Sequence, residues 1–554
     1  MDGQAKKADR HSALRSSYEA LQAGRFEAAR DHILPFLSPP VPRQPRKQQP
    51  GQQQPGQQQP DQTDLEASLL GGLALAACGD AALAAPLLVG VAARRPDSLH
   101  PCVDLISLLQ RQFKVRDAEP AFLACLSLTP EDPKLRLGHA QFLTDMRRFE
   151  EAMQAVEHCL RLLPDYLPAL NQKGIILVGI GRIEEALTLF RAVVESDPGN
   201  APAWANLGCT LTAEGAFEEA LSAYRRSIHI RPADAQIRLN HSITLLKSGR
   251  LVQGWQEHEW RFRLPGHTTL PLDRLLPTLT PHSDLAGRSV LLTHEEGIGD
   301  TLMMLRYVPK LARLGARVIA WVPASLVELV ARVEGIAGVM ATDTAELTCD
   351  YHCPFISLPR AFALRPDAWG AAVPYLRTDP DKVAALARLL PSPGSGLRVG
   401  LVWGGAPRPE NLAANAIDAR RSLPLSRLAP LAAIPGLALV NLQLGPYAGQ
   451  LNDPPDGMRV SDPMRLDMSM DDTASLVASL DIVVSVDTSV VHLAGGLGVP
   501  VILMDRYDNC WRWFSGRSDS PWYPSLTIIR QERAGDWDGV VARVAERLRS
   551  LTTR

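Results

Sequence analysis

Residues 201–234 read APAWANLGCTLTAEGAFEEALSAYRRSIHIRPAD, and their arrangement of glycine, alanine, aromatic and proline residues returns along the chain. Gly208 and Tyr224 have counterparts 34 positions earlier in Gly174 and Phe190. In each unit a glycine ends a first helix and a proline follows a second, so a unit reads as two antiparallel helices. A fixed period of this length predicts an α-solenoid, because one such unit alone cannot bury its apolar face.

These units extend along the first half of the chain, and they resemble the tetratricopeptide repeat. Units in one phase run over residues 65–234, and a weaker unit lies within 10–37. We expect Trp255 and Trp260, in a degenerate last unit, to cap the stack. The predicted domains of this half are a first helical pair at 1–38, an insert at 39–64 and a repeat array at 65–266.

The insert at 39–64 is rich in Gln, Pro and Gly, and it carries too little apolar surface to offset the entropy of ordering. We therefore expect it to be disordered. Two interpretations of the array stay open at this stage: a structural spacer, or a concave groove that binds a protein, a peptide or another acceptor.

From about residue 285 the pattern changes to short β-branched runs that alternate with helical segments, which predicts βαβ units and parallel sheets. The pattern pauses near 378–396 and then starts again. We therefore predict an α-solenoid followed by two Rossmann-like lobes, at residues 285–380 and 397–554.

A glycine-rich loop, HEEGIGDTL at 294–302, follows the first predicted strand of the first lobe. Ligands of such sheets lie beyond the carboxyl ends of the strands. Gly297 and Gly299 free the backbone there, and Asp300 either has a functional role or caps the next helix.

The second candidate segment is SVDTSVVHLAGGLGVP at 485–500, where a strand passes into a helix. Hydroxyl groups and free backbone N–H groups meet there with the positive end of the helix dipole, which favours a phosphate site. Ordinary helix capping is the alternative. The candidate residues are Asp487, Thr488, Ser489 and His492.

The order of the motifs in residues 285–550 is similar to the ADP-heptose:lipopolysaccharide heptosyltransferases, a family nine-like group of glycosyltransferases with the GT-B fold. The motifs are GIGDTLMMLRYVPKLARLGARV, VGLVWGGAP, RRSLPLSRLAPL, VDTSVVHLAGGLGVP and WRWFSGRSDSPWYP. The resemblance implies a nucleotide-sugar donor, with no metal or other cofactor, and it implies that Asp300 is the general base and that residues 487–492 hold the donor diphosphate.

Two further expectations concern charged and aromatic residues near the cleft between the two predicted lobes. A cation should stabilise the leaving diphosphate, and Arg421 is the candidate, ahead of Arg420. Trp403, Trp511 and Trp513, with Trp522, either line the cleft or belong to the core.

Composition excludes several other classes of protein. The net charge of −2 on 58 basic and 60 acidic residues gives no field that would recruit nucleic acid. Glu66 and Asp80 interrupt the most apolar segment, so no membrane span is expected. Eight scattered cysteines, and an N-terminus without a signal pattern, favour the cytoplasm. The CDYHC segment at 349–353 lacks the second pair of ligands that a structural zinc site needs.

The sequence thus predicts a glycosyltransferase that moves a sugar from a nucleotide-sugar donor to a glycan or protein acceptor selected by the repeats. The alternative is a non-catalytic scaffold with a degenerate α/β module. A dinucleotide-dependent oxidoreductase is disfavoured because the GxGxxG fingerprint is missing.

Overall fold

The computed structural model describes residues 2–552 except 24, 38–61, 93–118, 268–269, 281, 296, 342–348, 366–368, 371, 393, 395 and 409–411. Most of the insert predicted to be disordered lies outside the described residues. Its last part does not, because helix α3 (Gln62–Ala77) begins within the predicted range.

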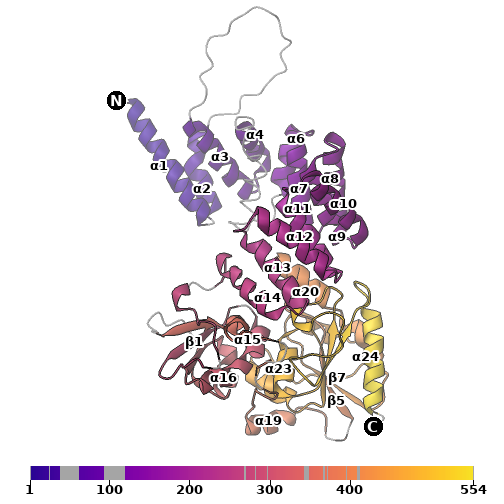
Figure 1. The fold of residues 1–554 in the computed structure, drawn as a ribbon. Helices are drawn as coiled ribbons and strands as arrows, with labels where there is room; N and C mark the ends of the chain where they lie inside the picture. The colour runs from indigo at the N-terminus through magenta and orange to yellow at the C-terminus, as the bar shows by residue number, and fades with distance from the viewer. Residues whose placement is uncertain are drawn as a thin grey trace, which may run out of the picture. The chain divides into compact units, whose positions relative to one another are not determined.

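The chain divides into two compact units, Met1–Asp197 and Pro198–Arg554. The first unit consists of helical pairs (Figure 1). Its described α-helices are α1 (Asp2–Gln22), α2 (Phe26–Ile33), α3, α4 (Ala81–Ala92), α6 (Glu119–Leu128), α7 (Pro133–Asp145), α8 (Phe149–Leu162), α9 (Leu167–Gly179) and α10 (Ile183–Ser196).

Four further helices of the same kind open the second unit. They are α11 (Ala201–Ala213), α12 (Phe217–Ile230), α13 (Ala235–Lys247) and α14 (Leu251–His258). The first helices of four successive pairs begin at Pro133, Leu167, Ala201 and Ala235, which is the predicted interval of 34 residues. The predicted helical repeat is therefore confirmed over these pairs.

The turn inside each pair needs a left-handed backbone. Gly181, Gly215 and Gly249 have φ values of 82°, 78° and 81°, and Arg147 takes the same place in the α7–α8 pair with φ of 59°. Glycine adopts this conformation without the steric cost of a Cβ atom.

The small residue in the first helix of a pair permits close packing. A Cβ atom added at Gly208 would lie 2.9 Å from the Tyr224 ring, and one added at Gly174 would lie 2.5 Å from the Phe190 ring. Both rings are buried, so each glycine lets the two helices of its pair approach.

The rest of the second unit has two parallel sheets, one in each predicted lobe. The sheet of the N-terminal lobe has the order β3-β2-β1-β4, from β1 (Ser289–Thr293), β2 (Arg317–Trp321), β3 (Ile336–Met340) and β4 (Tyr351–Pro354). The sheet of the C-terminal lobe has the order β10-β9-β8-β5-β6-β7, from β5 (Leu397–Val402), β6 (Leu437–Asn441), β7 (Val460–Ser461), β8 (Ile482–Val486), β9 (Val501–Asp505) and β10 (Leu526–Arg530).

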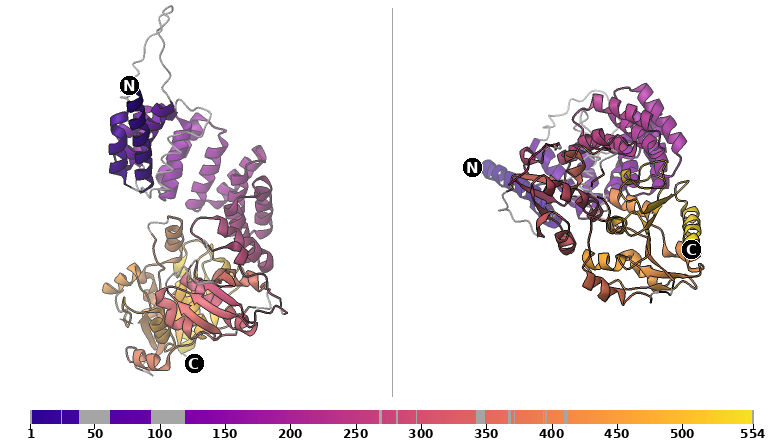
Figure 2. Two further views of the ribbon diagram at one scale, coloured as in Figure 1. Left: turned by 90° about the vertical axis from the view of Figure 1, so that its left-hand side faces the viewer. Right: turned by 60° about the horizontal axis from the view of Figure 1, so that its bottom comes forward.

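Helices cover both sheets, and the last of them, α24, lies on the outside of the C-terminal lobe (Figure 2). They are α15 (Ile298–Met304), α16 (Val308–Arg313), α17 (Val327–Ala331), α18 (Leu358–Ala361), α19 (Pro380–Ala387), α20 (Leu412–Arg421), α21 (Ala429–Ala432), α22 (Met470–Val477), α23 (Ser489–Leu497) and α24 (Trp537–Thr552). The predicted fold class, a repeat solenoid followed by two Rossmann-like lobes, is confirmed.

Each sheet reverses its strand order at one place. In the N-terminal lobe β1 lies between β2 and β4, and in the C-terminal lobe β8 and β6 flank β5. Ligands of open α/β sheets bind at such switch points, beyond the carboxyl ends of the strands. Both predicted motifs follow a strand that borders a switch point, since Asp300 comes after β1 and Asp487 comes directly after β8.

One hydrophobic core joins the two lobes and the last repeat helices. It contains Trp255 of α14, Leu302 of α15 and Leu493 of α23. Trp255 packs edge-on against Trp511, with ring centroids 4.9 Å apart. The degenerate last repeat therefore ends on the α/β module, where Trp255 is buried.

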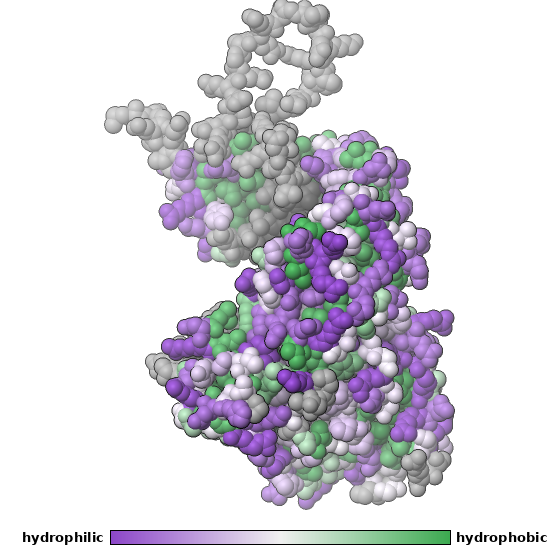
Figure 3. All heavy atoms as spheres, viewed as in Figure 1, coloured by the Kyte–Doolittle hydropathy of each residue, from purple (hydrophilic) through white to green (hydrophobic). Residues whose placement is uncertain are grey.

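Hydrophilic residues cover much of the face seen in Figure 3, and hydrophobic residues form small separate patches on it. Among the described residues, no helix combines the length and apolar character needed to cross a bilayer.

We predict that Gly208→Leu lowers the free energy of unfolding of the second unit by about 1–3 kcal/mol or more, because the added side chain meets the buried Tyr224 ring. Urea unfolding measures the change. The control is Gly449→Leu, at an exposed position with no atom within 4 Å of an added Cβ, which should change stability by less than about 0.5 kcal/mol. Equal losses in both variants would contradict the close-packing explanation.

Candidate active site

Asp300 lies in the first turn of α15, directly after the glycine-rich loop. The N-cap residue of this helix is Gly297, so Asp300 is not the cap. A Cβ atom at Gly297 would lie 3.1 Å from Asp300 Oδ2, and the glycine therefore leaves room for the carboxylate. Asp300 is buried, with 8% of its surface exposed.

The carboxylate of Asp300 is paired with an arginine from the other lobe. Arg512, in the short helix η9 (Trp511–Trp513), donates from Nε to Asp300 Oδ1 at 3.0 Å and from Nη2 to the same oxygen. Its guanidinium carbon lies 4.4 Å from the centre of the Trp511 ring, and Nη1 contacts Cys510 Sγ at 2.7 Å. Burial acts to lower the pKa of Arg512, but the Asp300 carboxylate holds that pKa well above its ordinary value.

Helices α15 and α23 cross at a glycine. A Cβ atom at Gly299 would lie 2.7 Å from His492 Cδ2 and 3.5 Å from Ser489 Cα. Gly299 therefore lets the two helices touch, and the contact places Asp300 beside the first turn of α23. The two segments predicted to form the site are thus brought together.

His492 is buried beneath this crossing. Its ring stacks on Trp513, with centroids 5.3 Å apart and 15° between the planes. Nδ1 is hydrogen-bonded to the Tyr523 hydroxyl at 2.9 Å. Burial, with a smaller contribution from the Arg512 charge, lowers the pKa of His492 to about 4. His492 is therefore neutral near pH 7. Its contacts with Trp513 and Tyr523 support the start of α23.

The first turn of α23 follows Asp487 and Thr488. Thr488 is the N-cap residue, yet its side chain makes no capping hydrogen bond, and its hydroxyl lies 3.2 Å from Ser485 Oγ instead. The Thr488 hydroxyl therefore does not cap the helix. Asp487 and Ser489 are half-buried at the same turn.

Arg421 also reaches this turn, but its guanidinium is already occupied. It donates to Asp418 Oδ1 from Nε at 3.1 Å and from Nη2 at 3.0 Å, and to the Asp487 carbonyl from Nη1 at 3.0 Å. Gly405 makes room for the pair, because a Cβ atom there would collide with both side chains. Arg420 pairs with Asp508 near the surface. Arg421 thus fixes the turn, and neither arginine is placed as a free cation.

The tryptophans predicted either to line the cleft or to fill the core are buried. Trp403 is fully buried among the aliphatic residues of the C-terminal sheet. Trp513 lies under His492, Trp511 between Trp255 and Arg512, and Trp522 donates from Nε1 to the Arg512 carbonyl. Trp403 is therefore a core residue, and the other three support the site residues.

Two residues that the sequence did not single out are central here. Arg512 lies between two tryptophans in the WRW motif, and Arg306 lies buried among the rings of Tyr375, Tyr523 and Trp522. Arg306 donates to the main-chain carbonyls of Met303 and Trp522 at 2.9 Å. In the sequence, the position of Arg512 inside an aromatic motif was the feature that could have identified it.

The last repeat helices contact the loops that carry the site. Arg261, fully buried, donates to Glu295 at 2.8 Å, to Glu259 at 2.7 Å and to Ser357 at 2.7 Å. Glu295 precedes the glycine-rich turn that leads to Asp300. The repeat region therefore holds the glycine-rich loop through Arg261 and the loop of Arg512 through Trp255.

The described residues contain no group of three or more His, Cys, Asp or Glu side chains arranged to hold a metal ion. In the CDYHC segment, His352 and Cys353 are buried in β4, and His352 Nε2 is hydrogen-bonded to the Pro271 carbonyl at 2.7 Å.

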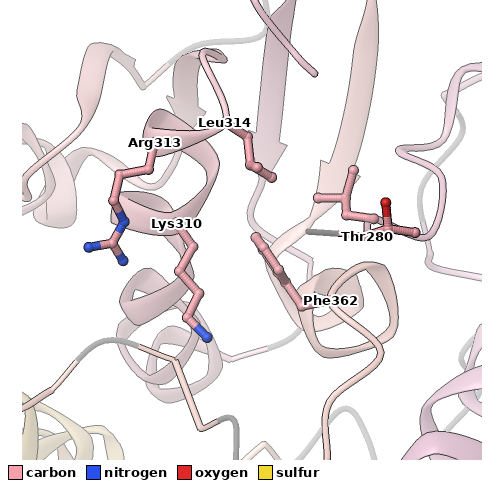
Figure 4. Close-up of a pocket in the computed structure, with 6 residues that line it drawn as sticks. Thr280, Lys310, Arg313, Leu314 and Phe362 are labelled. Atoms are coloured by element: carbon pink, nitrogen blue, oxygen red, sulfur yellow. The ribbon is translucent and has the colours of Figure 1, made fainter. Parts of the chain in front are cut away.

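A cavity of about 290 Å³ lies elsewhere in the N-terminal lobe (Figure 4). Leu314, one of its lining residues, is bonded through its carbonyl to Leu285, near the amino ends of β1 and β2. Asp300 follows the carboxyl end of β1, so this cavity is separate from the candidate site. It is lined by Leu279, Thr280, Lys310, Arg313, Leu314 and Phe362.

Comparison with known proteins identifies the helical pairs. A family model described as tetratricopeptide repeat matches residues 171–235. The match covers α10, α11 and α12 and most of α9. A solved tetratricopeptide-repeat protein from Parabacteroides merdae is 10% identical to this chain, with a TM-score of 0.31, over 47% of this chain and 94% of its own.

Two other similar proteins extend beyond the repeats. Protein FlbA from Caulobacter vibrioides is 27% identical over 335 residues, which cover 55% of this chain and 54% of that protein. This chain thus matches about half the length of that curated relative. A glycosyltransferase of family 9 from Veillonella parvula is 10% identical, with a TM-score of 0.37, over 48% of this chain and 99% of its own.

We predict that the free energy of unfolding falls as the pH drops from about 6.5 to about 4, because the unfolded chain protonates its histidines first while folded His492 resists protonation. The pKa difference limits the contribution of His492 to about 3 kcal/mol. His492→Gln should remove part of this dependence in urea titrations at several pH values. An unchanged pH profile in the variant would contradict the assignment.

Proposed function

We propose that the chain is a glycosyltransferase that moves a sugar from a nucleotide-sugar donor to a glycan or protein acceptor. The observation that carries the proposal is the position of Asp300 against the first turn of α23, because it puts a carboxylate and a phosphate-type site next to each other. Both lie at the switch points of their sheets, where ligands of such sheets bind.

The donor diphosphate would lie at the start of α23. This helix offers backbone N–H groups and the positive end of its dipole, and the hydroxyls of Thr488 and Ser489 stand at the same turn. The bond from Arg421 to the Asp487 carbonyl fixes the turn before any ligand arrives. A fixed turn lowers the entropic cost of binding.

Transfer needs a base on the acceptor side. The acceptor hydroxyl attacks the anomeric carbon, its proton passes to the Asp300 carboxylate, and the bond from the anomeric carbon to the phosphate oxygen breaks with its electron pair. The nucleoside diphosphate leaves with that pair. The residues alone give no reason to add a metal ion to this scheme.

The repeats would present the acceptor, because solenoids of this kind offer an extended concave surface. The cysteines that the structure describes form no disulfide, which fits a reducing compartment, and we propose a cytoplasmic location.

A non-catalytic scaffold is the second candidate, and one observation favours it. Asp300 is covered by Arg512, and a paired and buried carboxylate is a poor base. In that case the repeats would bind a partner and the α/β module would have a structural or ligand-sensing role.

We expect one member of a panel of ADP-, UDP-, GDP- and CMP-linked sugars to bind the full chain in titration calorimetry. The double variant Thr488→Val, Ser489→Ala should weaken that binding at least about tenfold, because it removes two hydrogen bonds to a charged group. Thr280→Val, which loses a hydroxyl at an exposed position in the other lobe, is the matched control and should bind as the wild type does.

With that donor identified, Asp300→Asn should bind it at least as tightly as the wild type does and lose at least about 100-fold in the rate of transfer to acceptors captured by the full chain. If no member of the panel binds, the glycosyltransferase proposal is wrong and the scaffold takes its place. If binding occurs but Asp300→Asn transfers at the wild-type rate, Asp300 is not the base.

A further inference from the structure

The leaving diphosphate of the proposed reaction needs a cation near the first turn of α23. Arg421 is neutralised by Asp418, and Arg306 is bonded to main-chain carbonyls inside its aromatic surroundings. Moving either arginine would break buried bonds that hold the turn or the lobe junction. Neither is therefore suited to pair with a substrate that comes and goes.

Arg512 differs in that its partner is the carboxylate of the reaction itself. Its guanidinium is bonded to Asp300, and Asp300 lies beside the first turn of α23, so Arg512 lies close to both the proposed base and the proposed phosphate site. With side chains 14% and 11% exposed, Arg512 and Asp300 are almost closed off from solvent. Both bonds from Arg512 end on Oδ1 of Asp300, so in this arrangement that carboxylate oxygen is already occupied.

We propose that Arg512 covers Asp300 in the free protein and pairs with the donor diphosphate when the donor binds, so that donor binding itself uncovers the base. This inference rests on the proposed glycosyltransferase function and adds a residue and an order of events to it. A diphosphate carries more negative charge than one carboxylate and offers several acceptor oxygens to a guanidinium, so it competes well for Arg512.

The surroundings of Arg512 permit this exchange. Its backbone is fixed, since Trp522 Nε1 donates to its carbonyl at 3.0 Å and the neighbouring Trp511 packs against Trp255. Its guanidinium carbon lies over the Trp511 ring, 4.4 Å from the ring centre, and a guanidinium can shift over such a ring while it keeps the cation–π contact. A fixed backbone with a mobile charged end suits a residue that changes partners.

The exchange places each charge where the reaction needs it. After the donor binds, the Asp300 carboxylate is free to take the acceptor proton, and Arg512 faces the oxygen that receives the electron pair of the broken bond. In a site without donor, Arg512 still covers Asp300. Acceptor bound alone is therefore not activated, and we expect the donor to bind first.

The test is a double-mutant cycle on diphosphate affinity in the full chain, with inorganic pyrophosphate and UDP, ADP, GDP and CDP as probes in titration calorimetry. Asp300→Asn should tighten binding of the best probe about tenfold, because Arg512 loses its competing partner. Arg512→Met should weaken it at least about tenfold. In the double variant, Asp300→Asn should change affinity by less than about threefold.

Two further variants serve as controls for this interpretation. Arg427→Met removes an arginine that pairs with Asp538 near the surface, and the affinity of this variant for the probe should stay within about threefold of wild type. Arg512→Lys keeps the charge and most of the volume, so it replaces Arg512→Met if the methionine variant does not fold, and it should give a smaller loss in the same direction.

The outcomes separate this inference from the function on which it rests. If the wild type binds a probe but Asp300→Asn does not tighten it, or tightens it equally without Arg512, the covering role is wrong and the donor site stands. If neither the wild type nor Asp300→Asn binds any probe or nucleotide sugar, both proposals fail.

Discussion

The contact between Gly299 and His492 is the constraint on which the site depends. It is the point where α15 of one lobe touches α23 of the other, and a side chain larger than hydrogen at 299 would push the helices apart. The crossing puts Asp300 next to the first turn of α23, and it buries an imidazole that must stay neutral. A single glycine therefore decides whether two segments almost 200 residues apart form one site.

The repeat region contributes to this arrangement from outside the lobes. Arg261 is buried with Glu259 and Glu295, an arrangement whose desolvation is costly unless every charge is satisfied, and here the arginine also reaches Ser357. Trp255 adds an apolar contact to the loop of Arg512. Because these two contacts lie on the loops of Asp300 and of Arg512, the last repeat is a third support of the candidate site.

Much of this architecture could be predicted from residues 201–234 and from the β-branched runs, since both patterns reflect local periodicity. The sequence analysis did not predict β3, whose central Ala337 and Gly338 lack strand-forming side chains, or β4, where it considered the CDYHC segment only as a zinc site and found it short of ligands. Asp300 and the 487–492 turn were found because they follow strands. The partner of Asp300 was not found, because its identity depends on how two distant segments pack. The spacing of residues along the sequence does not show this packing.

The same limit applies to charge. Arg421 was predicted to be the cation for the diphosphate, and it does reach the turn, but it is paired with Asp418 one helical turn away on α20. Trp403 likewise stands at a strand end where a ligand contact was plausible, and the packing of the sheet makes it a core residue. Residue type and position indicated where a site could lie. Only the tertiary contacts show which of those groups already have bonding or packing partners.

The division of the chain at residues 197 and 198 has a consequence for how this protein can change over time. The boundary falls between two repeat pairs rather than between the repeats and the lobes. Pairs before it pack mainly on their neighbours, so duplication or loss of a pair there alters the length of the solenoid and leaves the two lobes unchanged. The last pair, α13 and α14, shares a core with the two lobes and cannot be exchanged freely. A lineage can therefore vary the number of its early repeats while its last pair stays fixed.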